Sequence, residues 1–377
     1  VAGSGKTLIL AEKAVRAMKA GQRVLIVTFN ITLRHYIRDL VSQQFGPIER
    51  ERMRDQLVIQ HFHRFLQVIA LHHKLSIEFK KDIEEWTEIY INEITKWVDN
   101  SMDQLKNDGT YYFDTILIDE GQDFNGDWVR FLKKFYSGYG EFLVMYDQMQ
   151  DIYERGLWIT EPDKIKQIGF RGKPGMLTTS YRLPKLIVEK IEVVKRYFQL
   201  VEEEKYPTIQ AHHSEQLELF SDVCLTKTYS LTERDNVAQN VYTTYQYLSN
   251  RGAAPEDITI LTLQESVGVD ILNYFKKMKP KLKIAHVYDE SKKGDYEKRR
   301  KQKWKFQPGT GKLKISSYHS YKGWETPNII LVLKLENETQ AFDTIMKTTK
   351  EALLIGLSRV KKRNDHHPSH FICHNYL

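Results

Sequence analysis

Hydrophobic and polar positions alternate with two different periods along the first 170 residues. Thr7–Lys19 carries apolar residues at helical spacing and predicts an amphipathic helix, whereas Gln22–Phe29 is a β-branched run typical of a buried parallel strand. Two further apolar runs, Tyr112–Glu120 and Glu141–Gln148, end in acidic or polar residues, and a polar, helix-periodic stretch extends from about Phe65 to Leu105. Apolar strands that end in carboxylates predict an open α/β sheet with a site at its carboxyl edge.

A second series of elements follows the turn-rich segment Arg171–Gly175. A helix is expected from about Pro184 and another up to about Val360. Four apolar runs predict strands, and these are Ile258–Leu263, Lys283–Tyr288, Lys312–Ser320 and Asn328–Leu335. The pattern therefore predicts an α/β protein with two domains, 1–170 and 171–377.

Two polar segments lie within and after this second series. The charged stretch Lys292–Lys305 is interpreted as a solvated loop, with contact to a nucleic-acid backbone as the alternative. The tail Asn364–Leu377 gathers histidines and a cysteine in a short span, namely His366, His367, His370, Cys373 and His374. We expect this tail to be a frayed end; a metal site and a closing strand at His370–Cys373 are the alternatives.

Composition narrows the class of protein without giving its activity. The 377 residues are 41% hydrophobic and 28% charged, as in ordinary globular chains, and no apolar run approaches the length of a membrane span. The two cysteines, Cys224 and Cys373, are too few for a disulfide framework, so a reducing, cytoplasmic location is expected. A net charge of +7 permits binding to nucleic acid but does not require it.

The first seven residues, VAGSGKT, fit the second part of a phosphate-binding loop, G-x-x-x-x-G-K-[ST], without its initial glycine. Small residues in such a loop let backbone N–H groups point at phosphate, and here they are Gly3, Ser4 and Gly5. Lys6 is expected to reach the β- and γ-phosphates, and Thr7 to bind Mg²⁺. We interpret the start at Val1 as a truncation inside this motif that removes a central strand, which predicts poor folding and weak ATP hydrolysis.

The segment DEGQD, at Asp119–Asp123, follows the apolar run that begins at Tyr112. A magnesium-nucleotide site needs one carboxylate for the metal and its water shell and another to polarise the attacking water. Asp119 and Glu120 are the candidates for these two roles. A cluster that caps a helix would explain one of the acidic residues but not the set, so the two segments together predict hydrolysis of ATP or GTP with Mg²⁺.

Further short motifs follow one another along the chain. They are VTFN (Val27–Asn30), HFHRF (His61–Phe65), MYDQMQDIY (Met145–Tyr153), SYR (Ser180–Arg182), SSYHSYKGWE (Ser316–Glu325) and GLSRVKK (Gly356–Lys362). With DEGQD they resemble, in the same order, the conserved motifs of the UvrD/Rep-like superfamily 1 DNA helicases, and the resemblance extends from Val1 to about Lys362. His61, Tyr146 and Ser180 depart from that pattern, where the family usually has Thr, Gly and Asn.

The resemblance implies a more specific fold than the hydrophobic pattern does. It implies two RecA-like P-loop NTPase domains with parallel sheets, and a small helical, 1B-like insertion at about 64–109 in the first. The interval between Arg182 and His319 is too short for the large second insertion of the family. That insertion is therefore expected to be reduced or absent, and duplex separation to be less efficient than translocation.

The resemblance also implies roles for individual residues. Gln150 would sense the γ-phosphate, Arg182 and Arg359 would stabilise the charge of the transition state, and Glu325 would contact the nucleotide ribose or the coupling network. Contacts with single-stranded nucleic acid are implied for Thr28, Phe29, Asn30, His63, His319 and Lys322. Trp158 is expected either to stack on a base or to lie in the core.

The function expected from these observations is that of an ATP-dependent DNA helicase or translocase of DNA repair, moving 3′→5′ on single-stranded DNA or 3′-tailed duplexes. Two alternatives stay open. One is a DNA-binding ATPase switch, or a subunit partnered with a nuclease or repair protein, with little unwinding. The other is a helicase that acts on RNA. No membrane partner is expected.

Overall fold

The computed structural model describes residues 3–30, 33–46, 49–77, 83–147, 150–151, 155–159, 161–171, 174–181, 183–198, 200, 208–211, 225–230, 237–289, 302–303, 306, 311–334, 342–361 and 369–375. Arg182, Cys224, His366, His367 and most of the charged stretch Lys292–Lys305 lie outside these residues. The chain forms two compact units. The first unit is Gly5–Met176, and the second unit is Val1–Ser4 with Leu177–Leu377.

The first unit is built on a four-stranded parallel sheet in the order β2-β1-β3-β4. The strands are β1 (Val24–Thr28), β2 (Leu57–His61), β3 (Thr115–Asp119) and β4 (Phe142–Val144). β1 and β3 are buried at every position, as their continuous apolar sequences predict. β2 lay outside the sequence prediction.

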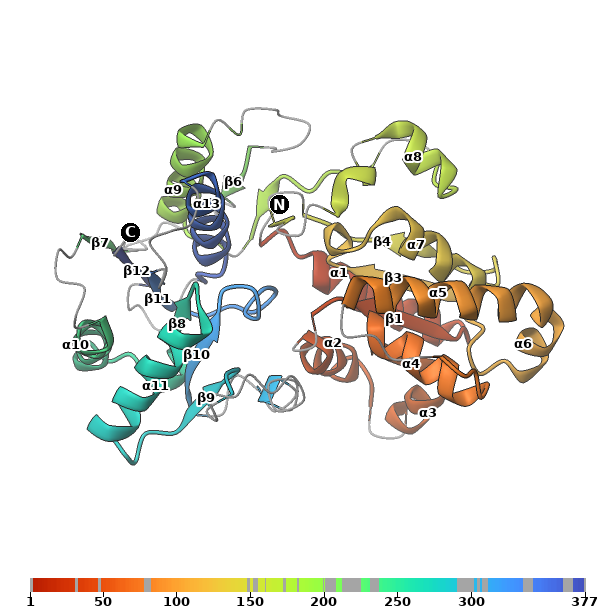
Figure 1. The fold of residues 1–377 in the computed structure, drawn as a ribbon, viewed down its shortest axis with the longest axis horizontal. Helices are drawn as coiled ribbons and strands as arrows, with labels where there is room; N and C mark the ends of the chain where they lie inside the picture. Colours follow the sequence, from red (N-terminus) through yellow and green to blue (C-terminus); the bar gives the residue numbers. More distant parts are fainter. Residues whose placement is uncertain are drawn as a thin grey trace. The chain divides into compact units, whose positions relative to one another are not determined.

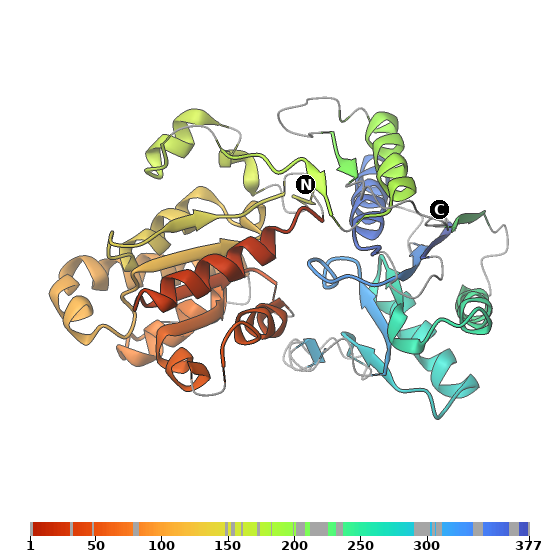
Figure 2. The same cartoon turned by 180° about the vertical axis from the view of Figure 1, so that it is seen from behind.

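Helices cover both faces of this sheet because side chains alternate along each strand. Val24 and Ile26 point to one face, where they pack with α1 (Lys6–Lys19) and α2 (Leu33–Ser42). Leu25 and Val27 point to the other face, toward α4 (Phe62–His72), α5 (Ile83–Asn100) and α7 (Gly126–Leu132). Figures 1 and 2 show α1 on one side of the sheet and α4 and α5 on the other.

Three helices lie between β2 and β3, in the region where an insertion was expected. They are α4, α5 and α6 (Met102–Asp108), and their residues Phe65, Trp86 and Leu105 belong to the same core cluster as Ile116 of β3. These helices therefore complete one face of the sheet. The other elements of the first unit are α3 (Glu49–Gln56), η1 (Gly121–Asp123), η2 (Lys133–Phe135), η4 (Gly156–Ile159) and α8 (Pro162–Gln167).

The second unit contains a six-stranded parallel sheet in the order β7-β12-β11-β8-β10-β9. Its strands are β7 (Leu225–Ser230), β8 (Ile258–Thr262), β9 (Ile284–His286), β10 (Leu313–Ser317), β11 (Asn328–Leu333) and β12 (His370–Asn375). Its helices are α9 (Lys185–Tyr197), α10 (Val237–Asn250), η6 (Pro255–Asp257), α11 (Glu265–Met278) and α13 (Phe342–Ser358), and β5 (Thr179–Ser180) pairs with β6 (Gln210–Ala211). The chain is thus an α/β protein with parallel sheets, as predicted.

The prediction that the C-terminal tail is frayed was wrong for His370–Asn375, which form β12; residues 364–368, 376 and 377 of the predicted tail lie outside the described residues. β12 pairs in parallel with β11 on one side and β7 on the other, so it lies inside the sheet. His370 Nδ1 lies 2.9 Å from Asn328 Oδ1, and His374 Nε2 lies 2.8 Å from Thr244 Oγ1, both in buried positions. The alternative of a strand at His370–Cys373 was correct. The two hydrogen bonds allow polar histidine side chains to occupy a buried strand.

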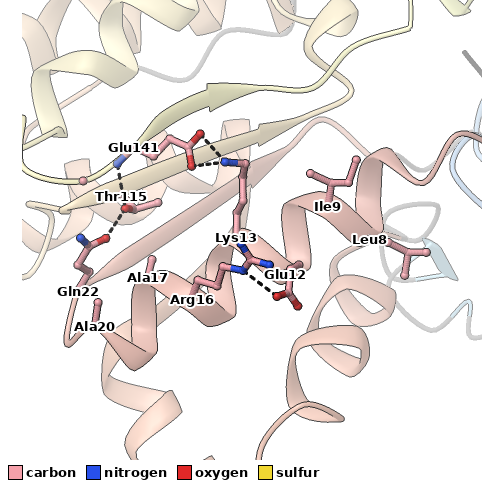
Figure 3. A pocket seen from close by; sticks show the side chains of 11 residues that line it. Leu8, Ile9, Glu12, Lys13, Arg16, Ala17, Ala20, Gln22, Thr115 and Glu141 are labelled. Atoms are coloured by element: carbon pink, nitrogen blue, oxygen red, sulfur yellow. Dashed lines mark hydrogen bonds and ion pairs between the residues drawn. The ribbon is translucent and has the colours of Figure 1, made fainter. Parts of the chain in front are cut away.

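A hollow of about 640 Å³ lies beside α1 in the first unit. Leu8, Ile9 and Ala17 of α1 line it on one side, and Thr115 and Glu141 on the other (Figure 3). None of the residues predicted for a site lines this hollow. None of the helices in the described part of the chain combines the length and the apolar character needed to cross a membrane.

Candidate active site

The carboxyl edge of the first sheet gathers polar residues from three strands. Thr28, the last residue of β1, is in register with His61 on one side and with Asp119 on the other. All three side chains are buried. Because the ends of parallel strands meet at one edge, residues up to 91 positions apart in sequence become neighbours there.

The turn after β3 has a backbone that few sequences can adopt. Glu120 has φ 55°, one of only two positive values among the described residues other than glycine. Such a conformation costs of order 1 kcal/mol or more and is concentrated at functional sites. At Gly121 an added Cβ would lie 2.3 Å from Cγ1 of Val144, so only glycine fits this close approach to β4. The turn therefore holds Glu120 at a fixed position above the sheet.

The start of α1 lies beside this turn. Gly5, at the N-cap, has φ 84°, which favours glycine, and its carbonyl accepts the first helical hydrogen bond from Ile9 N at 2.9 Å. Thr7 Oγ1 donates to Asp119 Oδ2 at 3.3 Å. Two residues that the sequence assigned to one metal ion thus approach each other across 112 positions. Gly3 and Ser4 belong to the second unit, where Tyr181 N donates to Gly3 O at 3.0 Å.

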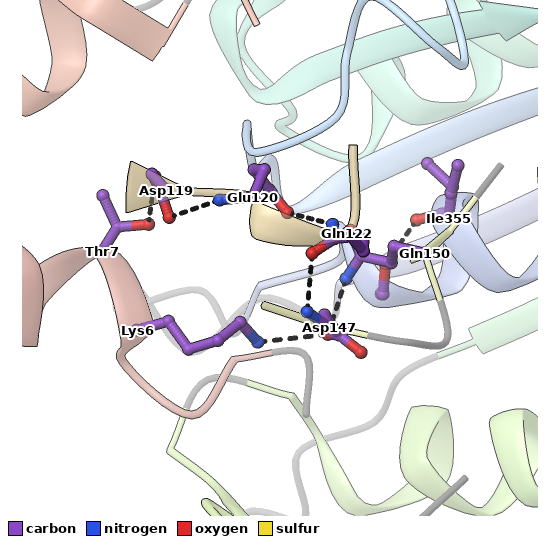
Figure 4. A network of polar contacts seen from close by, with 9 residues as sticks. Lys6, Thr7, Asp119, Glu120, Gln122, Asp147, Gln150 and Ile355 are labelled. Atoms are coloured by element: carbon purple, nitrogen blue, oxygen red, sulfur yellow. Dashed lines mark hydrogen bonds and ion pairs between the residues drawn. The ribbon is translucent and has the colours of Figure 1, made fainter. Parts of the chain in front are cut away.

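Lys6 is held by a carboxylate that the sequence interpretation did not single out. Its Nζ atom lies 3.1 Å from Asp147 Oδ2, and Gln150 Nε2 donates to the same oxygen at 2.9 Å (Figure 4). Asp147 comes shortly after the end of β4, in the same way that Asp119 is the last residue of β3. The carboxylate at the end of the run Glu141–Gln148 was the signal that could have identified it. Gln122, which was also missed, contacts both Glu120 and Asp147.

The electrostatics of the site favour a bound cation. Burial, and then the neighbouring carboxylate of Glu120, raise the pKa of Asp119 to about 7, while Lys6 and the hydrogen bond from Thr7 act in the opposite direction. The ionised form of Asp119 is therefore disfavoured unless a cation lies beside it. Carboxylate and hydroxyl oxygens are the ligands that Mg²⁺ prefers, so Asp119 and Thr7 fit this ion. Lys6 and the N-terminus of α1 fit a phosphate.

Four residues of the first unit were predicted to contact nucleic acid, and they lie at or next to the carboxyl edge of its sheet, beside aromatic side chains. Thr28 and His63 are buried, whereas Phe29 and Asn30 are half-buried. Phe29 stacks on Trp128 with a centroid distance of 6.1 Å, and the guanidinium of Arg155 lies 5.2 Å from the Phe29 ring. Phe29 and Asn30 are therefore the better candidates for direct contact.

Trp158, which the sequence left undecided, lies in the core. Its side chain is buried, and Nε1 donates to the carbonyl of Phe124 at 2.8 Å. It packs in the same cluster as Phe124 and Ile168. This residue is therefore part of the support for the site.

The remaining predicted residues belong to the second unit. Lys322 and Arg359 are buried and His319 is half-buried. Desolvation of its ring, together with the charge of Lys322, lowers the pKa of His319 to about 4. Glu325 forms an ion pair of 3.8 Å with Lys361. The structure brings together five predicted residues within the first unit, namely Lys6, Thr7, Asp119, Glu120 and Gln150. The predicted residues His319, Lys322, Glu325 and Arg359 belong to the second unit.

Comparisons with known proteins do not assign the chain to a family. No protein-family model matches it, and no curated protein is similar to it at a significant level.

Proposed function

We propose that the chain is an ATP-hydrolysing motor, a DNA helicase or translocase similar to the UvrD/Rep-like superfamily 1 enzymes, built of two RecA-like domains and acting in the cytoplasm. The observation that carries the proposal is the meeting of Lys6 and Thr7 with Asp119 and Glu120 at one sheet edge. These are the residue types that bind a nucleotide phosphate, hold Mg²⁺ and activate water.

Each residue would have a separate task in hydrolysis. Lys6 would exchange its partner Asp147 for a phosphate oxygen, and Asp119 with Thr7 would hold Mg²⁺, which neutralises phosphate charge when bound. Glu120 would orient the attacking water and accept its proton. The resemblance adds 3′→5′ movement on single-stranded DNA, loading on 3′-tailed duplexes and a partner that is a nuclease or repair protein.

Hydrolysis of MgATP with and without oligo(dT) tests the proposal. We expect the strand to raise the rate by about tenfold or more, since a motor couples its track to phosphoryl transfer. Lys6→Ala and Glu120→Gln should reduce hydrolysis to a small residual rate. Lys13→Ala is the matched control, because Lys13 lies on the same helix but pairs with Glu141 at 2.8 Å beside the hollow.

Two outcomes would decide against the motor or its track. Equal rates with and without any strand would contradict the motor and favour an ATPase switch. Stronger stimulation by oligo(U) than by oligo(dT) would assign the track to RNA. A strand-displacement assay on a 3′-tailed duplex then separates unwinding from translocation alone.

A further inference from the structure

Gln122 connects the ends of two strands through its side-chain amide. The residue is fully buried in η1, directly after β3. Its Nε2 atom donates to Glu120 Oε2 at 2.6 Å. Its Oε1 atom accepts from the backbone N–H of Asp147, beyond the end of β4, at 2.7 Å. Both ends of the amide are thus engaged at short distance (Figure 4).

The bond to Glu120 restricts the carboxylate that the proposed hydrolysis depends on. A hydrogen bond to an ionised group is roughly twice as strong as one between neutral groups. Glu120 is buried on a backbone of fixed, left-handed conformation, so its side chain has few other positions. The amide of Gln122 therefore selects the rotamer in which the carboxylate is held.

The bond to Asp147 connects the same amide to the phosphate-binding lysine. Asp147 Oδ2 receives both Lys6 Nζ, at 3.1 Å, and Gln150 Nε2, at 2.9 Å. A phosphate bound by Lys6 competes for the ammonium group that Asp147 holds. A shift of Asp147 then acts on Gln122, because the backbone N–H of Asp147 donates to Gln122 Oε1 at 2.7 Å.

We propose that Gln122 is a positioning residue that couples the partner of Lys6 to the placement of the Glu120 carboxylate. This inference rests on the proposed ATPase function and deepens it. It assigns to Gln122 the link by which occupation of the phosphate site sets the geometry for water attack.

The packing around Gln122 leaves it little freedom to absorb such a shift. A Cβ added at Gly156 would lie 3.1 Å from both Cα and Cβ of Gln122, so the backbone of η4 lies directly against this residue. The carboxylate of Asp151 fixes that backbone in turn, accepting from Arg155 N at 3.1 Å and Gly156 N at 3.0 Å. Displacement of Asp147 is therefore passed to the side-chain amide and from there to Glu120.

Gln122→Met removes both hydrogen bonds while it nearly preserves the volume. We expect kcat for MgATP to fall by about 10- to 100-fold, the range for loss of a hydrogen bond to a charged group. The Kd of MgADP should stay within about threefold, because Lys6 and Thr7 remain in place. Gln22→Met is the matched control: Gln22 Oε1 accepts from Thr115 Oγ1 at 2.7 Å near the opposite edge of the same sheet. It should lower the melting temperature similarly and leave kcat unchanged.

A double-mutant cycle separates positioning from general support of the fold. If Gln122 acts through Glu120, adding Gln122→Met to Glu120→Gln changes the residual single-turnover rate by less than about twofold. Multiplication of the two losses, or a kcat for Gln122→Met within twofold of the wild type, would overturn the inference while hydrolysis by the wild-type protein still supports the proposed function. A wild-type protein that does not hydrolyse MgATP would overturn both.

Discussion

Acidification should destabilise the second unit through a histidine inside its sheet. Burial lowers the pKa of His374 from 6.5 to about 4, since this residue is buried on β12, a strand that lies between two neighbouring strands. An unfolded chain takes up a proton at this residue below pH 6.5, whereas the folded chain does not until about pH 4. The unfolded state thus binds more protons in this interval, and stability falls as the pH falls.

The size of the effect follows from the two pKa values. Near pH 7.5 the contribution is negligible, and at pH 5 the loss is about 2 kcal/mol for His374. In hydrogen exchange of peptides that cover Asn328–Leu333, corrected for the intrinsic rate, His374 alone should account for about 30-fold less protection at pH 5 than at pH 7.5. His319, with a pKa also lowered to about 4, adds a second loss of the same sign.

His374→Gln tests this reasoning because glutamine keeps a polar group for Thr244 but does not titrate. Protection at pH 7.5 should fall modestly. On going from pH 7.5 to pH 5, the variant should not show the factor of about 30 in lost protection that His374 contributes in the wild type. His72→Gln is the control, since His72 is exposed and lies in the first unit. An unchanged pH dependence in His374→Gln would refute the assignment.

Three further predictions concern the first unit. Gly121→Ala should destabilise it by more than about 2 kcal/mol in urea denaturation, because the new Cβ overlaps Val144, whereas Gly175→Ala meets open space and should be neutral. Asp147→Asn should tighten MgADP binding about fivefold in a fluorescence titration, since Lys6 loses a competing partner; weaker binding would contradict this. Phe29→Leu should weaken oligo(dT) binding by about tenfold in fluorescence anisotropy and leave the Kd of MgADP unchanged; equal DNA affinity would remove Phe29 from the track.

The strands that carry the site were predictable because burial on both faces leaves a continuous apolar run. Val24–Thr28 and Thr115–Asp119 are buried throughout and stand out in the sequence. Leu57–His61 is short and buried at only two of its positions, so its pattern is weak. β12 was expected only as an alternative, because its histidines mark the segment as polar, and only the contacts with Asn328 and Thr244 show how those histidines are accommodated.

The candidate site was predictable where residue type and local position suffice. Asp119, Glu120, Lys6 and Thr7 each follow from a short motif at the end of a strand or the start of a helix. The partner of Lys6 does not, because Asp147 is 141 positions away and its role depends on where β4 ends beside β3. The role proposed for Gln122 could not be predicted from the sequence for the same reason, since it depends on two partners that only the fold brings together.

The edge of β4 has a consequence for how the protein behaves in concentrated solution. Among the described residues β4 pairs only with β3, and its three apolar residues, Phe142, Leu143 and Val144, are half-buried. An apolar strand with an open side is a template on which another extended chain can add. The ion pair of Lys13 with Glu141 places charge next to this edge, and salt weakens the protection that such charge gives. Aggregation of this protein should accordingly begin at β4 and become faster as ionic strength rises.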